Sequence, residues 1–198
     1  PTSAPLVVTF HDLAFIREPS HFGRWGRLLL GRSLELAKRH ATLVLCSSMA
    51  TVEDCAAQGI DRDRLRLIPL GVRPTSIAPS TIDEVRHKYG LPSEYLLFVG
   101  TLEPRKNLHR LVEAVRRLTD APPLVVVGPT GWGDAMPDIG SLDIRLLGRV
   151  SAVERDALYA GCSVSCYPSI WEGFGLPVLE AMAAGVPVVT SRGVSTEE

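Results

Sequence analysis

Short apolar runs alternate with amphipathic helical patterns along this chain of 198 residues. Residues 124–127, Leu-Val-Val-Val, are apolar at every position, which suits a strand covered on both faces of its sheet. Strands of this kind that alternate with helices are typical of a parallel sheet with crossover helices. The pattern therefore predicts an α/β fold.

The expected elements form two groups, separated by a proline-rich segment at 69–82. In the first group we expect strands at 6–10, 41–46 and 65–68, and helices at 24–39 and 48–58. In the second group we expect strands at 95–99, 124–127, 144–147, 164–167 and 186–190, and helices at 82–89, 108–118, 152–160 and 177–184. Ser47 or Ser48 is the expected cap of the second helix, and glycines 59 and 90 are the expected stops of two helices.

Composition excludes several classes of protein. Apolar residues make up 45% and charged residues 22%, as in ordinary globular proteins, and the net charge of −1 gives no support for binding to nucleic acid. No apolar run approaches the roughly 20 residues of a membrane span, and no signal peptide is visible. The four cysteines, Cys46, Cys55, Cys162 and Cys166, lack zinc-site spacing. We expect reduced core cysteines in a cytoplasmic protein.

The segment 169–191 carries the most chemical information. It places Glu172 and Glu180 on either side of a glycine-rich turn that opens a short helix. Pro177 suits the first helical position, and Gly185 suits a left-handed residue that ends the helix.

The backbone amides around Gly173, Phe174 and Gly175 lie at the N-terminus of that expected helix, where N–H groups can hold an anion. Carboxylates on both sides could accept hydrogen bonds from sugar hydroxyls, so these parts could bind a phosphorylated sugar. The alternative is that both glutamates only complement the positive helix end, worth about 0.3–1 kcal/mol each.

A second candidate segment, 100–107, follows an expected strand and precedes a helix. Arg105 and Lys106 lie where a ligand at the carboxyl edge of the sheet would sit. Charge-assisted hydrogen bonds from such cations suit a diphosphate. The alternative is a solvated basic turn, but two cations at a helix start oppose its dipole, which favours an anionic partner.

Two weaker signals remain. His11 follows the strand 6–10 and could donate to a ligand or move a proton, although a lone histidine there is more often structural. The loops 128–133 and 148–150 follow strands and could line a nucleobase pocket.

Together these segments resemble the retaining, nucleotide-sugar-dependent glycosyltransferases of the GT-B fold, family 4. The residues 172–180, Glu-Gly-Phe-Gly-Leu-Pro-Val-Leu-Glu, match the family's E-x7-E motif, and 98–107 is nearly as specific. The resemblance runs from His11 to Ser191 and suggests bacterial mannosyltransferases of surface-polysaccharide assembly. It implies parallel Rossmann-like sheets with flanking helices.

The resemblance also implies a domain organisation. Residues 1–75 would form part of an acceptor-side domain, 76–91 a connector and 92–198 most of a donor-binding domain. The chain would then be a fragment that lacks an N-terminal strand and C-terminal helices, and we expect it to keep donor binding while turnover is weak or lost.

The family pattern assigns roles to residues of this chain. Glu172 would contact the hydroxyls of the donor sugar, Glu180 would contact the ribose, and His11 would lie near the donor sugar from the acceptor side. The residues implied in donor binding are Arg105, Lys106, Gly173, Phe174, Gly175, Leu176, Glu180 and Val150, the last through its backbone to the base. Several members of the family carry an arginine after the strand glycine, where this chain has Thr101. In this chain the positive charge that binds the diphosphate would therefore come from Arg105 and Lys106.

The function implied is transfer of a hexose, mannose-like and carried by a donor such as GDP-mannose, to a saccharide or lipid-linked acceptor. No metal and no cofactor is expected, because cationic side chains replace the metal and the nucleotide sugar is a co-substrate. A binding module without transfer activity and a sugar-nucleotide epimerase stay open as alternatives. The basic helix at 24–39 could touch the inner face of a membrane, or could be an ordinary domain helix with a solvated face.

Overall fold

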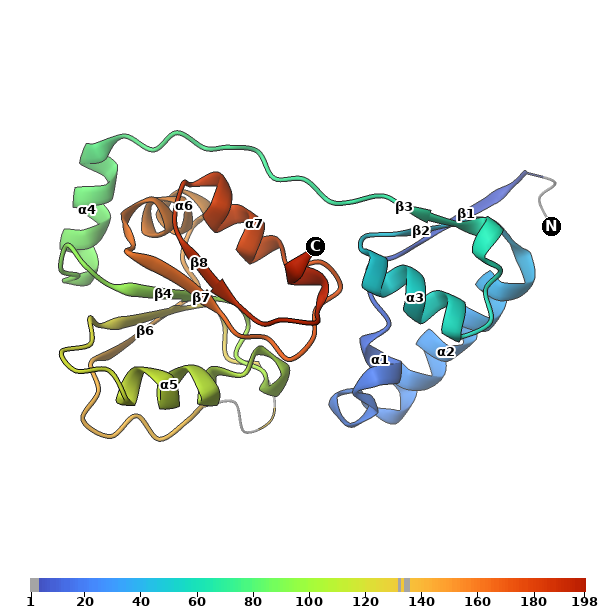
Figure 1. Ribbon diagram of the computed structural model, residues 1–198, viewed down its shortest axis with the longest axis horizontal. Coiled ribbons are helices and arrows are strands. Elements are labelled where there is room, and N and C mark those ends of the chain that lie inside the picture. Colours follow the sequence, from blue (N-terminus) through green and yellow to red (C-terminus); the bar gives the residue numbers. More distant parts are fainter. Residues whose placement is uncertain (1–3, 132, 134–135) are drawn as a thin grey trace. The chain divides into compact units, whose positions relative to one another are not determined.

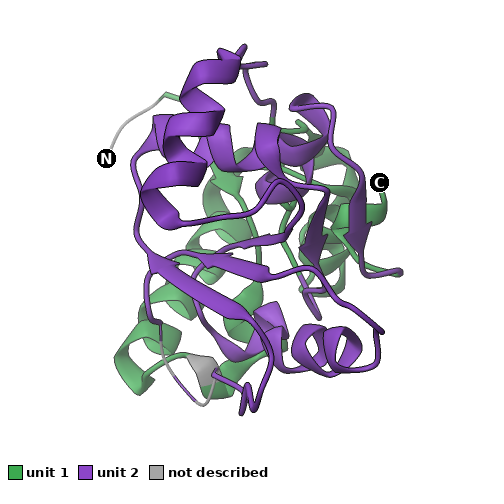
Figure 2. Ribbon diagram, turned by 90° about the vertical axis from the view of Figure 1, so that its left-hand side faces the viewer, with its two compact units in different colours: residues 1–70, 172–175, 193–198 green, residues 71–171, 176–192 purple. Residues whose placement is uncertain are grey.

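The computed structural model describes residues 4–131, 133 and 136–198. The chain forms two compact units (Figure 2). Unit 1 comprises residues 1–70, 172–175 and 193–198, and unit 2 comprises residues 71–171 and 176–192. Each unit contains its own parallel sheet, so the predicted α/β class is confirmed.

Unit 1 is built on a three-stranded parallel sheet in the order β1-β2-β3 (Figure 1). Its strands are β1 (Leu6–Phe10), β2 (Ala41–Cys46) and β3 (Leu65–Leu67), and its helices are α1 (Ala14–Arg17), α2 (Arg24–His40) and α3 (Met49–Ala57). Ser48 caps α3 by accepting a hydrogen bond from the Thr51 N–H at 3.1 Å. One of the two predicted caps is therefore confirmed.

Helix α2 uses only one stripe of its surface for packing in unit 1. Leu34 and Ala37 are buried in a hydrophobic cluster with residues of β2 and α3. The opposite stripe leaves Trp25, Leu29 and Leu36 exposed.

Unit 2 is built on a five-stranded parallel sheet in the order β6-β5-β4-β7-β8. Its strands are β4 (Leu96–Val99), β5 (Leu124–Val127), β6 (Ile144–Gly148), β7 (Val164–Tyr167) and β8 (Val188–Thr190). β5 and β6 lie on one side of β4, and β7 and β8 lie on its other side, so the strand order reverses at β4. Ligands of open parallel sheets bind at the carboxyl ends of strands beside such a switch in strand order.

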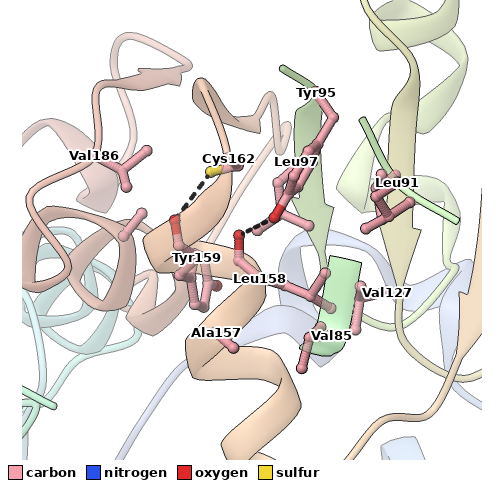
Figure 3. Packing of buried hydrophobic residues seen from close by; sticks show 12 residues of the cluster. Val85, Leu91, Tyr95, Leu97, Val127, Ala157, Leu158, Tyr159, Cys162 and Val186 are labelled. Atoms are coloured by element: carbon pink, nitrogen blue, oxygen red, sulfur yellow. Dashed lines mark hydrogen bonds between the residues drawn. The ribbon is translucent and has the colours of Figure 1, made fainter. Parts of the chain in front are cut away.

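In the part of unit 2 that the structure describes, α-helices cover both faces of this sheet: α4 (Pro79–Tyr89), α5 (Leu108–Arg116), α6 (Ala152–Gly161) and α7 (Leu176–Ala183). Val125 and Val127 belong to one hydrophobic cluster and Leu124 and Val126 to another, because successive side chains of a strand point to opposite faces. The first cluster contains α6 residues, and in Figure 3 the Tyr95 hydroxyl donates to the Leu158 carbonyl oxygen. The prediction that 124–127 is covered on both faces is confirmed.

The structure differs from the expectations mainly at element ends. Helix α4 begins at Pro79 rather than at residue 82, since a proline is tolerated in the first turn. It therefore occupies most of the predicted connector 76–91, and its Val85 is buried in unit 2. Helix α7 begins at Leu176, which makes Pro177 its second residue, and Gly185 is left-handed as predicted. The short helix α1 was missed; there the Asp12 carboxylate accepts a hydrogen bond from the Ala14 N–H.

All four cysteines are buried and carry free thiols. No helix within the described residues is long and apolar enough to cross a bilayer. The domain ranges 1–75, 76–91 and 92–198 stay predictions.

Candidate functional site

The loop after β4 is fastened to the segment after β7. Glu103 is only 3% exposed, and its carboxylate lies 2.6 Å from the Arg105 guanidinium. Arg105 also donates to the Trp171 carbonyl oxygen at 3.2 Å, while its own carbonyl oxygen accepts a hydrogen bond from the Ile170 N–H. A buried carboxylate and a second loop therefore fix the position of the Arg105 guanidinium.

Lys106 lies in the same loop and is 7% exposed. Its ammonium group donates to the Tyr167 hydroxyl and lies 4.8 Å from the centroid of that ring. Asn107, in the left-handed conformation, donates to the Pro168 carbonyl oxygen at 3.1 Å. A buried ammonium group is costly unless it is paired, and the polar and aromatic contacts reduce that cost. Both predicted cations thus lie at the carboxyl ends of β4 and β7.

The segment 172–175 belongs to unit 1. Glu172 is 6% exposed, and its carbonyl oxygen accepts a hydrogen bond from the Ser195 hydroxyl at 2.8 Å. The Ser47 hydroxyl lies 3.1 Å from the Gly173 carbonyl oxygen and 2.8 Å from that of His11. A Cβ atom on Gly173 would lie 2.2 Å from the His11 carbonyl oxygen, so only glycine fits there without a shift. The structure thus brings the predicted residues His11 and Glu172–Gly175 into one region of unit 1.

Glu180 lies in α7 and is held by two residues of α6. The Tyr159 hydroxyl donates to Glu180 Oε2 at 3.2 Å, and Arg155 Nη1 lies 3.3 Å from Oε1. Burial, and secondly the Glu180 charge, raises the pKa of Tyr159, so its hydroxyl stays protonated and donates. Glu180 and Leu176 line a cavity of about 310 Å³, together with residues of the segment 71–75.

A second cavity of about 310 Å³ lies at the carboxyl ends of β4, β5 and β6. Val150, predicted to meet a base, lines this cavity with Thr101 and residues 127–129. Trp132 of the predicted loop 128–133 lies outside the described residues. Gly128 and Pro129 of this loop and Arg149 and Val150 of 148–150 thus line the same cavity in unit 2.

Sequence reasoning missed several residues that hold the predicted ones in place: Glu103, Tyr167, Ser47, Arg155 and Tyr159. Glu103 had a signal, since it lies two residues before Arg105 in a turn that ends a strand. The others are distant in sequence and become neighbours only on folding. Among the residues that the structure describes, no group of three or more His, Cys, Asp or Glu could hold a metal ion.

Two family models match the chain. The model of glycosyl transferases group 1 covers residues 81–198, and that of the glycosyl transferase 4-like domain covers residues 1–71. The chain is 35% identical over 97% of its length to O-antigen chain mannosyltransferase B of Escherichia coli. It is 32% identical over 96% of its length to D-inositol 3-phosphate glycosyltransferase of Mycolicibacterium smegmatis.

The chain belongs to the group 1 glycosyl transferases. A solved structure of HepE from Anabaena, in complex with UDP and glucose, matches 98% of the chain with a TM-score of 0.80 and 25% identity. The GT-B fold implied by the resemblance is therefore confirmed. The chain covers 54% of the E. coli relative, 47% of the M. smegmatis relative and 54% of HepE, so this glycosyl transferase sequence spans about half the length of these proteins.

Proposed function

We propose that the full-length protein transfers a hexose, with mannose favoured, from a nucleoside-diphosphate sugar to a saccharide or lipid-linked acceptor, retaining the anomeric configuration. The observation that carries this proposal is the pair of cations, Arg105 and Lys106, held at the switch in strand order of unit 2. The name of the E. coli relative supports a mannosyl donor, and the UDP and glucose in HepE support a donor of the nucleotide-sugar class.

The proposed roles follow the chemistry of each group. Arg105 and Lys106 neutralise the diphosphate, and Glu180 accepts hydrogen bonds from the ribose. Val150 meets the base through its backbone, in the cavity at the ends of β4 to β6.

Unit 1 supplies the remaining groups. Glu172 accepts hydrogen bonds from the hydroxyls of the donor sugar, and His11 lies near that sugar. The amides of Gly173 to Gly175 directly precede α7, and together with the amide of Leu176, the first residue of α7 in unit 2, they hold the diphosphate and the sugar.

The rate depends on how the leaving group is stabilised. As the bond between the anomeric carbon and the diphosphate oxygen breaks, negative charge develops on the diphosphate. Preorganised donors and cations aimed at that charge lower the barrier. Because side chains supply the positive charge, we propose a reaction without a metal ion or a cofactor.

Binding of the nucleotide is the first test. We expect calorimetry of the full-length protein to detect UDP or GDP with a Kd between about 1 μM and 1 mM, the range typical of enzyme substrates. Failure of both nucleotides to bind would contradict the proposal.

The two alternatives are separated by incubating the protein with nucleotide sugar. A transferase releases nucleoside diphosphate faster when acceptor is added, and NMR of the product shows the same anomer as the donor. Epimerised sugar would indicate an epimerase, and binding without any conversion would indicate a binding module.

We also propose that α2 rests on the cytoplasmic face of an anionic membrane. With about 100° between residues, Trp25, Leu29 and Leu36 fall on one stripe opposite the buried Leu34. Trp25 is 83% exposed, and Arg32 lies on the same stripe. Apolar residues flanked by arginine suit the boundary between lipid headgroups and acyl chains.

Vesicles of phosphatidylglycerol and phosphatidylcholine test this proposal. The double variant Trp25→Ser, Leu29→Ser should lower vesicle binding of the full-length protein at least tenfold, because burying each side chain contributes about 1.5–3 kcal/mol. Leu118→Ser, which alters an exposed leucine of unit 2, should leave binding unchanged. Wild-type protein that stays in solution would overturn the proposal.

A further inference from the structure

Arg155 is a residue of α6 to which neither the sequence analysis nor the proposed roles give a function. It lines two cavities of unit 2, the one that contains Glu180 and the one that contains Val150. Its side chain is 36% exposed, so it is neither a core residue nor a fully solvated one. A guanidinium shared by two cavities is well placed to affect a ligand that occupies both.

The contacts of Arg155 fix the direction of its guanidinium group. Nε and Nη2 donate to Oδ1 of Asp156 at 3.0 and 2.8 Å. Nη1 is then the nitrogen that faces Glu180, at 3.3 Å from Oε1. Asp156 therefore orients Arg155, and Arg155 in turn contacts one oxygen of Glu180.

Tyr159 completes this arrangement from the next turn of the same helix. Residues four apart lie on one face of a helix, so Arg155 and Tyr159 approach Glu180 from the same side. Arg155 contacts Oε1 and Tyr159 donates to Oε2. The rotation of the carboxylate is thus restrained at both of its oxygens.

A restrained carboxylate can still accept further hydrogen bonds. An ionised carboxylate has about four lone-pair sites, and the two contacts from α6 occupy two of them. The remaining sites keep a constant direction, and Glu180 lines a cavity where a ligand could meet them. A pair of neighbouring hydroxyls requires such a constant direction, because both must reach the acceptor together.

We propose that Arg155 is a positioning residue that aims Glu180 at the ribose diol, and that this makes the protein select ribonucleotides over 2′-deoxyribonucleotides. The inference rests on the proposed function, in which Glu180 accepts hydrogen bonds from the ribose. An ion pair that only stabilised the surface would leave this selectivity untouched, since exposed pairs contribute little and touch no ligand.

The test compares the affinity of the full-length protein for UDP and GDP with its affinity for the corresponding 2′-deoxynucleotides. We expect the wild type to prefer the ribonucleotide at least tenfold and Arg155→Gln to prefer it less than threefold. Asp156→Asn should also reduce the preference, because loss of the negative charge weakens the two hydrogen bonds that orient the guanidinium. Arg116→Gln breaks an ion pair with Glu113 in α5 and serves as the matched control, with an unchanged preference.

A double-mutant cycle isolates the contact between Arg155 and Glu180. In the Glu180→Gln background, Arg155→Gln should change the preference no further, because its target is already altered. Thermal unfolding of each variant checks that it is folded. If Arg155→Gln does not fold, Asp156→Asn and the partial rescue expected for Arg155→Lys carry the test.

The outcomes separate the two proposals. A wild type that binds none of these nucleotides contradicts the proposed function itself. A wild type that binds ribo- and deoxyribonucleotides equally, or an Arg155→Gln variant that keeps the tenfold preference, overturns the inference on Arg155 and leaves a transferase in place. A variant that loses both nucleotides in equal measure also overturns it, since Arg155 would then act through something other than the ribose.

Discussion

Replacement of Lys106 by methionine is expected to lower kcat for glycosyl transfer by the full-length protein at least about tenfold, or 1.4 kcal/mol. Methionine keeps an unbranched chain over the Tyr167 ring but removes the charge. That charge acts most strongly in the transition state, when the diphosphate becomes more negative. The effect should therefore appear mainly in kcat, and steady-state kinetics at several donor concentrations measures it.

Tyr167→Phe is the matched control for this variant. It removes the hydroxyl that the Lys106 ammonium group contacts and leaves the ring in place beside Phe98. We expect a smaller loss of kcat from Tyr167→Phe than from Lys106→Met, because the cation remains. Equal kcat for Lys106→Met and wild type would show that Lys106 has no role in stabilising the leaving group.

A second large effect is expected at Gly128, which follows β5. Its φ is +140°, a conformation that residues with a side chain rarely adopt, and an added Cβ would lie 2.0 Å from the Gly100 carbonyl oxygen. β4 and β5 pair from Leu96–Leu124 to Val99–Val127, so this contact lies between the ends of neighbouring strands. Gly128→Ala should lower the free energy of unfolding by about 3 kcal/mol, the sum of backbone strain and overpacking.

Chemical denaturation of the full-length protein measures this loss. Gly140→Ala is the control, because Gly140 also has a positive φ, +54°, but an added Cβ meets nothing within 4 Å. It should cost only about 1 kcal/mol, from strain alone. If Gly128→Ala and Gly140→Ala lowered the free energy of unfolding equally, the close approach of residue 128 to Gly100 would make no contribution to stability.

The sequence predicted the strands of this fold well where apolar runs stand between turn residues. The bounds of β1, β2, β5 and β7 were predicted without error, because polar or turn-forming residues flank each run. The start of α4 was missed by three residues, since the prolines before it were interpreted as a connector. Helix α1 has only four residues, too few for a helical period to be visible.

The sequence predicted the charged residues of the candidate site, but not the residues that hold them in place. Arg105 and Lys106 were chosen as candidates because two cations before a helix are unfavourable without an anion. Glu172 and Glu180 were chosen because they flank a glycine-rich turn. The contact from Arg105 to Trp171 spans 66 residues, and that from Tyr159 to Glu180 spans 21. Sequence periodicity carries no information on pairs so far apart, because they meet only through the packing of the sheet and its helices.

Unit 1 contains segments from both ends of the sequence, and this affects how it folds during synthesis on the ribosome. The N–H groups of Met49 and Ala50, at the start of α3, donate to the Glu198 carboxylate at 2.7 and 2.9 Å. Translation at about 5–20 residues per second delivers Glu198 roughly 7–28 s after α3 has been synthesised. During that interval the start of α3 lacks this carboxylate, so the nascent chain completes unit 1 only after every strand of unit 2 has been synthesised.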